Sequence, residues 1–450
     1  MSIFNGERLT NRVFKLDVER MRRGWYSDQY FANILAMLRG VSLADGYQGQ
    51  FHRAVDIDPT GLNVGDIEVE MQFFTRRMGK TVVVGVDKAL SMLRHCTGYF
   101  DAAGNWVETW QNLAVTAVHD GAITEYHGDP LHVQPVIRVH GRYRDFALLE
   151  TPMLGILSRS SRIATNVYKT LRAAKGKSVL FFPARFDLHE VQAADGYAYD
   201  IAVARFNLDF ASTLRSFIST DAQGDWWGGA GGGTVAHAAI ACFLGDTAAT
   251  MMAFAEHVPA AIPRIALVDF NNDSVADSLH TMTAMFNRYA ALLDNGRIEE
   301  AQRYVLYGVR LDTSGALRDV NVPPLGDPML DLGVTPRLVF TVRQALDTAW
   351  LAWDIRPDQV ALAQEYCRNV QIVVTGGFNP EKITRFEKLS VPADIYGVGS
   401  SLLANDKETN NDFTADVVRL KIDGRWQDMA KVGRAPADNP DLEPVDLAPL

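Results

Sequence analysis

From about residue 150 onward, short apolar stretches alternate with helical segments, and this rhythm constrains the fold more than any other feature. A helix is expected between the second and third stretch, because apolar residues from Val275 to Leu292 form one stripe that ends at Asn295-Gly296. Alternation at this spacing predicts a parallel α/β domain, either a barrel or an open sheet. The apolar stretches are SVLFFPA (178–184), RIALVDF (264–270), YVLYGVRLD (304–312), VQIVVTGGF (370–378) and ADIYGVGSS (393–401).

The first third of the chain has a different pattern, with strand-like runs and few helical ones. A helix is expected at SDQYFANILAML, where Ser27 or Asp28 could cap the first turn. Runs rich in Val and Ile, bounded by Gly and Pro, favour β structure. This part therefore reads as a mixed α+β domain. Its strand-like runs are IEVEMQFF (67–74), KTVVVGV (80–86) and HVQPVIRVHGRY (132–143).

Composition and charge exclude several classes of protein. The net charge is −10 and no block of Lys and Arg stands out, which argues against a nucleic-acid binder. Three distant cysteines fit neither a zinc site nor a disulfide framework, which favours a reducing compartment. The chain begins without a signal-peptide pattern and has no apolar run of about 18 residues. We therefore expect a cytoplasmic protein with no membrane partner.

Two glycine loops on consecutive strands are the strongest candidates for chemistry. Gly376 and Gly377 follow one strand and precede a helix near Pro380, while Gly399 and Ser400 follow the next strand. Glycine lets backbone N–H groups approach an anion, and a helix N-terminus favours negative charge. Either loop alone is more often a plain turn. Two such loops at one end of a parallel sheet resemble the phosphate-binding end of (β/α)8 barrels, so the pair favours phosphate binding.

Charged residues end two further strands. Arg310 and Asp312 lie two positions apart and point to the same face. This pair suits a polyphosphate with Mg²⁺, since Arg contacts oxygens and Asp holds the metal or its waters, although a structural ion pair is equally consistent. Asp269 ends another strand and could bind a metal or sugar hydroxyls, whereas Asp273 fits a helix cap.

Two other segments carry candidate side chains. His237 follows a glycine-dense run, and such a loop is costly in entropy without a use, although a lone histidine is more often a core residue. Phe182 and Arg185 lie in FFPARFDLHE (181–190), at the end of the expected strand SVLFF, and could hold an aromatic carboxylate. An aromatic ring would stack on the phenylalanine while the guanidinium pairs with the carboxylate.

Taken together, these segments resemble the nicotinate phosphoribosyltransferase family. The matching stretches occur in the family's order over roughly residues 25–435. The glycine segments are fairly specific, and the others are weak individually. The stretches are YSDQYF, ETPMLGILSRSSRIAT, FFPARF, GGGTVAHA, VRLDTSG, VVTGGFNPEKI and YGVGSSL.

The resemblance implies an irregular (β/α) barrel-like domain of the type II phosphoribosyltransferase class over 146–405, with a mixed α+β N-terminal domain over 1–145. Residues 406–450 would return to the N-terminal domain, and their Pro- and Asp-rich end, 435–450, is expected to be irregular or disordered. The resemblance also implies a homodimer whose active sites lie at the subunit interface, with Tyr30 supplied across the dimer to stack on the pyridine ring.

The resemblance implies roles for the remaining candidates. Phe182 and Arg185 are similar to the family's pyridine clamp, and His237 to a histidine that is transiently phosphorylated when ATP hydrolysis is coupled to synthesis. The pyrophosphate and metal region would include Arg310, and Asp312 would be the metal ligand. The expected substrate-binding set is completed by Asp269, Ser314, Gly376, Gly377, Gly399 and Ser400.

The expected reaction joins nicotinate to phosphoribosyl pyrophosphate with Mg²⁺ and ATP, in NAD salvage. Many relatives carry a second Arg where this chain has Phe186, so nicotinamide stays open as the substrate. Many also carry an acidic residue where this chain has Ala316, which leaves one metal or ribose contact unassigned. A quinolinate enzyme, a non-catalytic phosphate-binding relative and a sugar-phosphate enzyme of unrelated chemistry are also compatible with these segments, because a fold alone does not fix a function.

Overall fold

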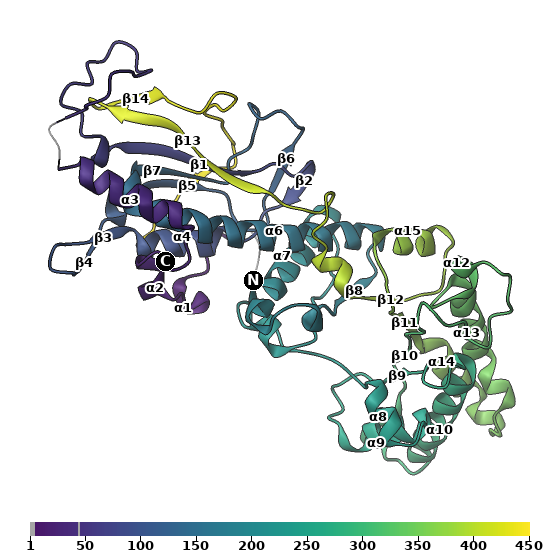
Figure 1. Cartoon of the computed structure of the whole chain (residues 1–450). Coiled ribbons are helices and arrows are strands. Elements are labelled where there is room, and N and C mark those ends of the chain that lie inside the picture. The colour runs from purple at the N-terminus through teal and green to yellow at the C-terminus, as the bar shows by residue number, and fades with distance from the viewer. Residues whose placement is uncertain (1–4, 44–45) are drawn as a thin grey trace.

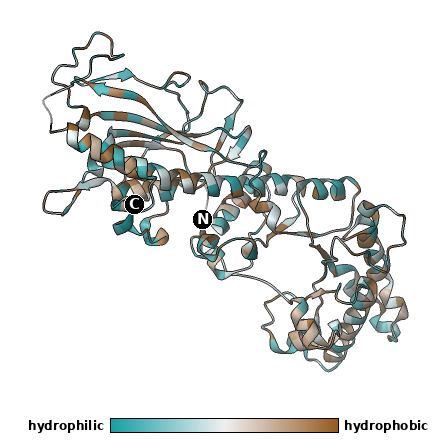
Figure 2. Cartoon of the chain, in the orientation of Figure 1, coloured by the Kyte–Doolittle hydropathy of each residue, from teal (hydrophilic) through white to brown (hydrophobic). Residues whose placement is uncertain are grey.

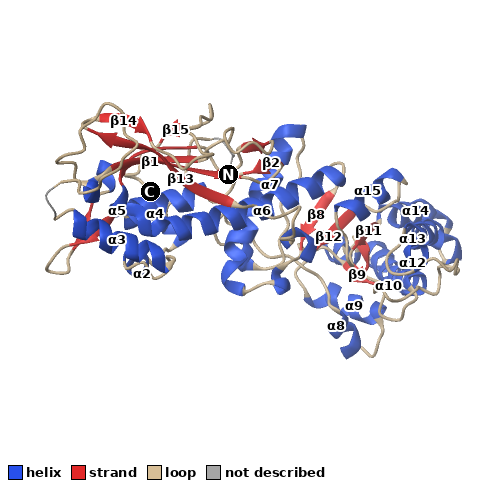
Figure 3. Cartoon of the chain, turned by 45° about the horizontal axis from the view of Figure 1, so that its top comes forward, coloured by secondary structure: helices blue, strands red, loops and turns tan. Residues whose placement is uncertain are grey.

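The computed structural model describes residues 5–43 and 46–450. It has two lobes, and the long helix α6 (Glu150–Ala173) runs from one to the other (Figure 1). One lobe is built on an antiparallel sheet and the other on a parallel sheet, as the strands in Figure 3 show. The predicted combination of α/β and mixed α+β architecture is therefore confirmed. No described helix has the length and apolarity needed to cross a membrane.

The antiparallel sheet has six strands in the order β14-β13-β1-β7-β5-β15. Buried and partly exposed residues alternate along β7, and Figure 2 shows apolar and polar segments interleaved across this sheet. Such alternation gives a strand one face for the core and one polar face. The strands of this lobe are β1 (Glu68–Thr75), β2 (Gly79–Val82), β3 (Gly98–Phe100), β4 (Trp106–Glu108), β5 (Ala114–Ala117), β6 (Ile123–Tyr126), β7 (Ile137–Arg142), β13 (Phe413–Ile422), β14 (Arg425–Asp428) and β15 (Glu443–Pro444).

The helices of this lobe cover the apolar side of the sheet. Helix α4 is buried along most of its length and shares one hydrophobic core with β1, β5, β7 and the first half of α6. These helices are α1 (Asn11–Phe14), α2 (Val18–Arg22), α3 (Gln29–Val41), α4 (Val86–Cys96) and α5 (Tyr143–Phe146). The predicted helix after Ser27 is α3, but neither proposed cap forms. Asp28 makes no capping bond and instead accepts from Thr151, while Ser27 donates to the Leu148 carbonyl.

The parallel sheet has five strands in the order β8-β12-β11-β10-β9. Each of the five apolar stretches forms one strand, and the strands are almost wholly buried between helices, as parallel strands require. They are β8 (Ser178–Phe181), β9 (Ile265–Leu267), β10 (Gly308–Leu311), β11 (Gln371–Val374) and β12 (Ile395–Val398). The helices around them are α7 (Gln192–Phe210), α8 (His237–Cys242), α9 (Thr247–His257), α10 (Ser274–Asp294), α11 (Ile298–Ala301), α12 (Pro328–Asp331), α13 (Pro336–Thr348), α14 (Val360–Asn369) and α15 (Pro380–Lys388).

The sheet is not closed by a ladder between its two edge strands in the part of the chain that is described. Two single bridges extend the β8 edge instead, from Phe181 to Ile218 and from Ile218 to Gly231. Farther along this segment, the Val235 carbonyl accepts from Arg310 on β10. The glycine-dense segment therefore contacts β8 at one edge of the sheet and β10, the neighbour of the other edge strand.

The C-terminal segment joins the antiparallel lobe. Strands β13 and β14 complete one side of the sheet, and β15 adds to the other side next to β5. Apart from β15, the tail after Ala435 is irregular, as expected, but it is fixed to the lobe. The Asn439 side chain donates to the buried Pro135 carbonyl, and Leu447 and Leu450 enter the hydrophobic core. Apolar residues at its far end give this Pro- and Asp-rich tail an attachment that composition did not predict.

Candidate functional site

Strands β9, β10, β11 and β12 lie in one parallel sheet (Figure 1), and most of the candidate residues follow their carboxyl ends. Leu267 of β9 lies opposite Arg310 of β10, and Leu311 of β10 lies opposite Val374 of β11. Asp269, Asp312 and Gly376 therefore follow three neighbouring strands at the same end. Parallel α/β sheets bind ligands at this end.

Arg310 is a largely buried cation at this edge. Its Nη2 donates to the Val235 carbonyl at 3.4 Å, and its Nε has no hydrogen-bond partner among the described residues. Burial lowers the pKa of Arg310, although the nearby carboxylates of Asp312 and Asp269 partly oppose the shift and Arg185 adds to it. A guanidinium held in this way has donors left over for an anionic ligand.

Asp269 and His237 form the second element of the site. His237 is the first residue of α8, and its Nε2 lies 2.9 Å from Asp269 Oδ1. The histidine side chain is 46% exposed, whereas that of Asp269 is 8% exposed. Burial raises the pKa of Asp269, with Asp312 adding to the rise and His237 opposing it. A buried carboxylate thus fixes an accessible imidazole, which is the arrangement that orients a reactive histidine.

The Gly376–Gly377 loop lies beside Asp312. Both glycines have positive φ, 84° and 68°, and a Cβ on Gly376 would lie 3.4 Å from Asp312 Oδ1. Thr375 donates through its hydroxyl to the same Asp312 oxygen at 2.8 Å. The next residues cap α15, since the Asn379 side chain accepts from the Lys382 amide at 2.8 Å. The turn therefore places Gly376 and Gly377 between the Asp312 carboxylate and the N-terminus of α15.

Lys382 adds a cation to this loop. Its Nζ lies 3.3 Å from the Gly376 carbonyl oxygen and 4.2 Å from the centroid of the Phe378 ring. Burial lowers the pKa of Lys382 to about 8, and Arg385 contributes in the same direction. No carboxylate lies within ion-pair distance of it in residues 5–43 and 46–450.

The second glycine loop is connected to the first and to β8. Ser401 donates through its hydroxyl to the Phe378 carbonyl at 3.0 Å, which joins the two loops. A Cβ on Gly399 would come within 2.7 Å of the Phe186 ring, and one on Gly397 within 3.0 Å of the Phe182 ring. The Thr375 methyl group is closer still to the Gly397 position, at 2.5 Å, so a larger residue at either glycine would force these side chains to move.

Phe182 and Arg185 therefore lie on the same side of the sheet as the glycine loops. The Phe182 ring centroid is 6.1 Å from that of Phe217 in an edge-on arrangement. Arg185 is close enough to Arg310 to lower its pKa. The Arg185 guanidinium also lies 5.4 Å from the centroid of the Phe186 ring. An aromatic surface and two cations consequently border one region.

Two predicted residues lie apart from this group or make no contact with it. Tyr30 is on α3 in the antiparallel lobe, where it is 54% exposed and its ring packs on Phe31. Ser314 follows β10 and its contacts are local, since its hydroxyl accepts from the Ala316 amide and its carbonyl from the Leu317 amide. Ser400, in contrast, belongs to the second glycine loop, where it begins the short turn after Gly399.

Comparison with known proteins agrees with this architecture. Residues 56–161 match the family model described as the N-terminal domain of quinolinate phosphoribosyl transferase. Nicotinate-nucleotide pyrophosphorylase from Pyrococcus furiosus is 22% identical over 93% of this chain and 80% of that one, with a TM-score of 0.60. Human nicotinic acid phosphoribosyltransferase is 16% identical over 88% of this chain and 75% of that one, with a TM-score of 0.50. No curated protein sequence matches.

The chain has the type II phosphoribosyltransferase fold. The resemblance to nicotinate phosphoribosyltransferases is thereby confirmed at the level of the fold. Within this phosphoribosyltransferase fold, the strand ends that carry the candidate residues belong to the parallel-sheet lobe.

Several contributors to the site were not among the predicted residues. Thr375 holds Asp312, Lys382 holds the Gly376 carbonyl, and the Val235 carbonyl holds Arg310. Thr375 directly precedes the glycine pair, so its position at a strand end was the available signal. A backbone carbonyl such as that of Val235 has no sequence signal at all.

The described residues contain no group of three or more His, Cys, Asp or Glu side chains arranged to hold a metal ion. The carboxyl end of the sheet carries two carboxylates, Asp312 and Asp269, and both oppose the lowering of the Arg310 pKa. Mg²⁺ commonly takes one or two carboxylates together with substrate phosphates and water. The donor set fits that mode and does not fit an all-protein metal cage.

Proposed function

We propose that the protein is a nicotinate phosphoribosyltransferase, which forms nicotinate mononucleotide and pyrophosphate from nicotinate and phosphoribosyl pyrophosphate with coupled ATP hydrolysis, in NAD salvage. The observation that supports this most is the meeting of Arg310, Asp312 and the Gly376 loop at the carboxyl ends of adjacent parallel strands. A guanidinium, a carboxylate and a glycine loop at one end of the sheet suit a sugar that carries both a phosphate and a pyrophosphate.

The chemistry needs positioning and charge stabilisation more than a strong base. The pyridine nitrogen uses its own lone pair to bond to ribose C1 while the C1–O bond breaks and pyrophosphate leaves with that electron pair. Arg310 is suited to the leaving group because its donors are not used up by carboxylates. The glycine loops at Gly376 and Gly399 are suited to the 5′-phosphate. Catalysis of this kind depends on pre-arranged dipoles and charges.

When bound, Mg²⁺ would neutralise the pyrophosphate as negative charge develops on it. Asp312 is its proposed protein ligand, and Thr375 fixes one oxygen of that carboxylate at 2.8 Å. Asp269, whose pKa is raised by burial, would contact substrate hydroxyls or metal-bound water. These contacts need no third carboxylate.

The proposed pyridine site uses Phe182 as a stacking surface and Arg185 as the carboxylate partner. Where many relatives have a second Arg, Phe186 packs against Gly399. The stacking partner on the other side of the ring would be Tyr30 of the partner subunit. Other large apolar residues in the same part of the chain are also exposed, including Trp25 at 71% and Met37 at 58%. A surface of this kind favours a homodimer, in which a second copy would cover it.

His237 is the proposed point of ATP coupling. A ring nitrogen would attack the γ-phosphorus of ATP, ADP would leave, and water would later release the phosphate. Its contact with Asp269 at 2.9 Å fixes the ring through Nε2 and leaves Nδ1 as the nitrogen not engaged by that carboxylate. His237→Ala should keep some basal transfer and lose stimulation by ATP. Equal stimulation in variant and wild type would refute this role.

Pyrophosphate release with phosphoribosyl pyrophosphate, Mg²⁺ and each of nicotinate, nicotinamide and quinolinate tests the proposal. We expect nicotinate to be the best substrate, because one guanidinium, Arg185, is assigned to the ring carboxylate. A preference for nicotinamide would replace the substrate assignment, and turnover of quinolinate would point to Arg310 as a second carboxylate partner. No release with any of the three would indicate a non-catalytic phosphate-binding relative.

A further inference from the structure

Asn166 lies behind the second glycine loop, and its side chain contacts two other parts of the chain. It is on α6 and is 5% exposed. Its Nδ2 donates to the Leu402 carbonyl at 3.2 Å and to the Ala404 carbonyl at 3.1 Å. Its Oδ1 accepts from Arg77 Nη2 at 3.0 Å. One buried amide thus connects the end of β1, the middle of α6 and the turn after β12.

Arg77 determines which way this amide points. A guanidinium can only donate, so the oxygen of Asn166 must face Arg77 and its NH₂ group must face the loop. With the opposite orientation, donors would face donors and two buried carbonyls would lose their partner. A buried polar group without its partner costs about 1–3 kcal/mol. The Arg77 contact therefore secures both bonds to the loop.

The two carbonyls held by Asn166 belong to the turn that carries Gly399 and Ser400. Within this turn, the Leu402 amide donates to the Gly399 carbonyl at 3.0 Å. On its other side, the Ser401 hydroxyl reaches the Phe378 carbonyl in the first glycine loop at 3.0 Å. The turn is therefore held between α6 and the first glycine loop. Loss of either attachment would leave it free to shift.

Arg77 itself is in an unusual setting. It is 4% exposed, and its Nε and Nη1 have no hydrogen-bond partner in residues 5–43 and 46–450. Burial lowers its pKa to about 10, and Arg162 contributes in the same direction. Its guanidinium has Asn166 as a side-chain partner. The Asp406 carboxylate partly opposes this lowering of the pKa. A buried charge that is only partly compensated contributes poorly to stability, whereas its contact with Asn166 orients the loop.

We propose that Arg77 and Asn166 are positioning residues that hold the Gly399–Ser401 turn in register to bind the 5′-phosphate, a role that rests on the proposed phosphoribosyl transfer. Neither residue touches the substrate. Arg77 orients the Asn166 amide, the amide holds the Leu402 and Ala404 carbonyls, and the turn keeps its place beside Phe378.

Asn166→Asp separates this role from a purely structural one. The new carboxylate would form an ion pair with Arg77, which offsets the loss of the donor at both loop carbonyls, so the thermal midpoint should change little. We expect the KM for phosphoribosyl pyrophosphate to rise about tenfold with kcat within about twofold, because phosphate binding acts equally on ground state and transition state. Asn207→Asp is the matched control. Asn207 is on α7 and holds the Leu214 carbonyl at 2.8 Å in another loop, so its KM should not change.

Arg77→Met provides a second variant. It frees the amide to turn and should raise the KM less than Asn166→Asp, without loss of stability. An unchanged KM in both variants overturns the positioning role. A lower kcat together with a lower thermal midpoint also overturns it, because that result indicates general loss of structure. If the wild type itself fails to turn over, the proposed function falls. In that case the positioning role is tested by the increase in thermal midpoint that inorganic phosphate causes. This increase should be smaller in Asn166→Asp than in wild type, and equal increases overturn the role.

Discussion

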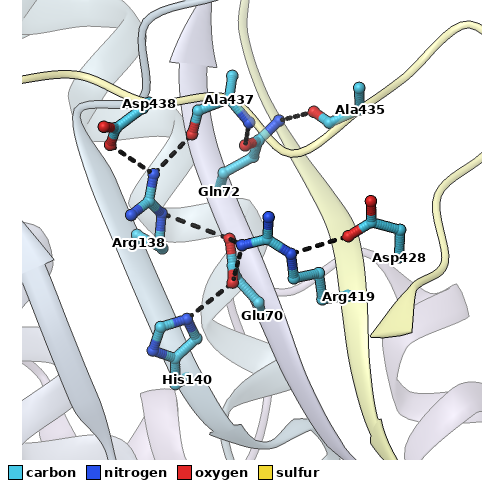
Figure 4. Close-up of polar contacts among 9 residues, drawn as sticks. All are labelled: Glu70, Gln72, Arg138, His140, Arg419, Asp428, Ala435, Ala437 and Asp438. Carbon is cyan, nitrogen blue, oxygen red and sulfur yellow. Dashed lines mark hydrogen bonds and ion pairs between the residues drawn. The ribbon is translucent and has the colours of Figure 1, made fainter. Parts of the chain in front are cut away.

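The antiparallel and parallel sheets each bury a charged side chain on a strand, but they treat that charge in opposite ways. On β1, Glu70 lies opposite His140 of β7 and Arg419 of β13, and it contacts both at 3.0 Å (Figure 4). Arg138 adds a second guanidinium at 3.5 Å. On β10, Arg310 has one backbone acceptor at 3.4 Å and an unpartnered Nε among the described residues.

The difference is visible in the proton affinities. Burial would raise the pKa of Glu70, but hydrogen bonds from His140 and Arg419 outweigh it and the pKa is lowered. For Arg310, the effect of burial outweighs that of the neighbouring carboxylates and the pKa is lowered. Its charged form is therefore less stable here than it would be in water. A charge that its neighbours neutralise contributes to the fold. A charge left partly uncompensated is ready for a ligand of opposite sign.

Arg310→Met should give the largest effect. We expect phosphoribosyl transfer to fall by about a thousandfold, equivalent to about 4 kcal/mol of transition-state stabilisation. The free energy of unfolding should stay the same or rise, because the substitution removes a poorly compensated buried charge. Pyrophosphate release and urea denaturation measure the two quantities. A loss of stability as large as the loss of activity would make Arg310 a structural residue like Glu70.

Glu70→Gln tests the other side of the comparison. Two guanidinium groups and the His140 imidazole lose their shared carboxylate, so the free energy of unfolding should fall by about 2 kcal/mol, less than for a fully buried pair because Arg419 is partly exposed. The contribution of Glu70 is present above its unfolded pKa and is lost as pH falls through its lower folded pKa. Acid unfolding of the wild type should therefore be steeper than that of the variant. Transfer activity at pH 7 should change by less than about twofold.

Lys382→Gln examines the cation beside the first glycine loop. With a pKa lowered to about 8, the ammonium is charged at pH 7 and becomes neutral as pH rises. We expect the wild-type KM for phosphoribosyl pyrophosphate to rise above pH 8, and the variant to show a KM about fivefold higher at pH 7 with no such rise. Parallel pH profiles in the two proteins would exclude Lys382 from phosphate binding.

Asp428→Asn should give the smallest effect. Asp428 pairs with Arg419 at 2.9 Å, but its side chain is 72% exposed. Exposed ion pairs contribute about 0–1 kcal/mol, so the free energy of unfolding should change by less than about 0.5 kcal/mol. A larger change in urea denaturation would mean that the cations around Glu70 act as one extended network.

Much of the fold followed from local patterns. The five apolar stretches became β8 to β12, and the stripe from Val275 to Leu292 became α10, with Asp273 as its cap. The glycine pairs and Arg310 could be assigned to strand ends because strand ends are local. The caps proposed for α3 were wrong, because Asp28 found a tertiary partner in Thr151. Competition between local and distant acceptors is not visible in a sequence.

The sequence by itself determined the strand–helix rhythm, the glycines that admit close backbone approach, and the charge types at the strand ends, since each depends on residues near one another in the chain. Only the tertiary structure decided which strands are neighbours, that Asp269 meets His237, and that Asn166 links Arg77 to the turn after β12. Such contacts join residues that are tens to hundreds of positions apart. They depend on how whole elements pack, and packing balances burial, charge and hydrogen bonding over the entire chain.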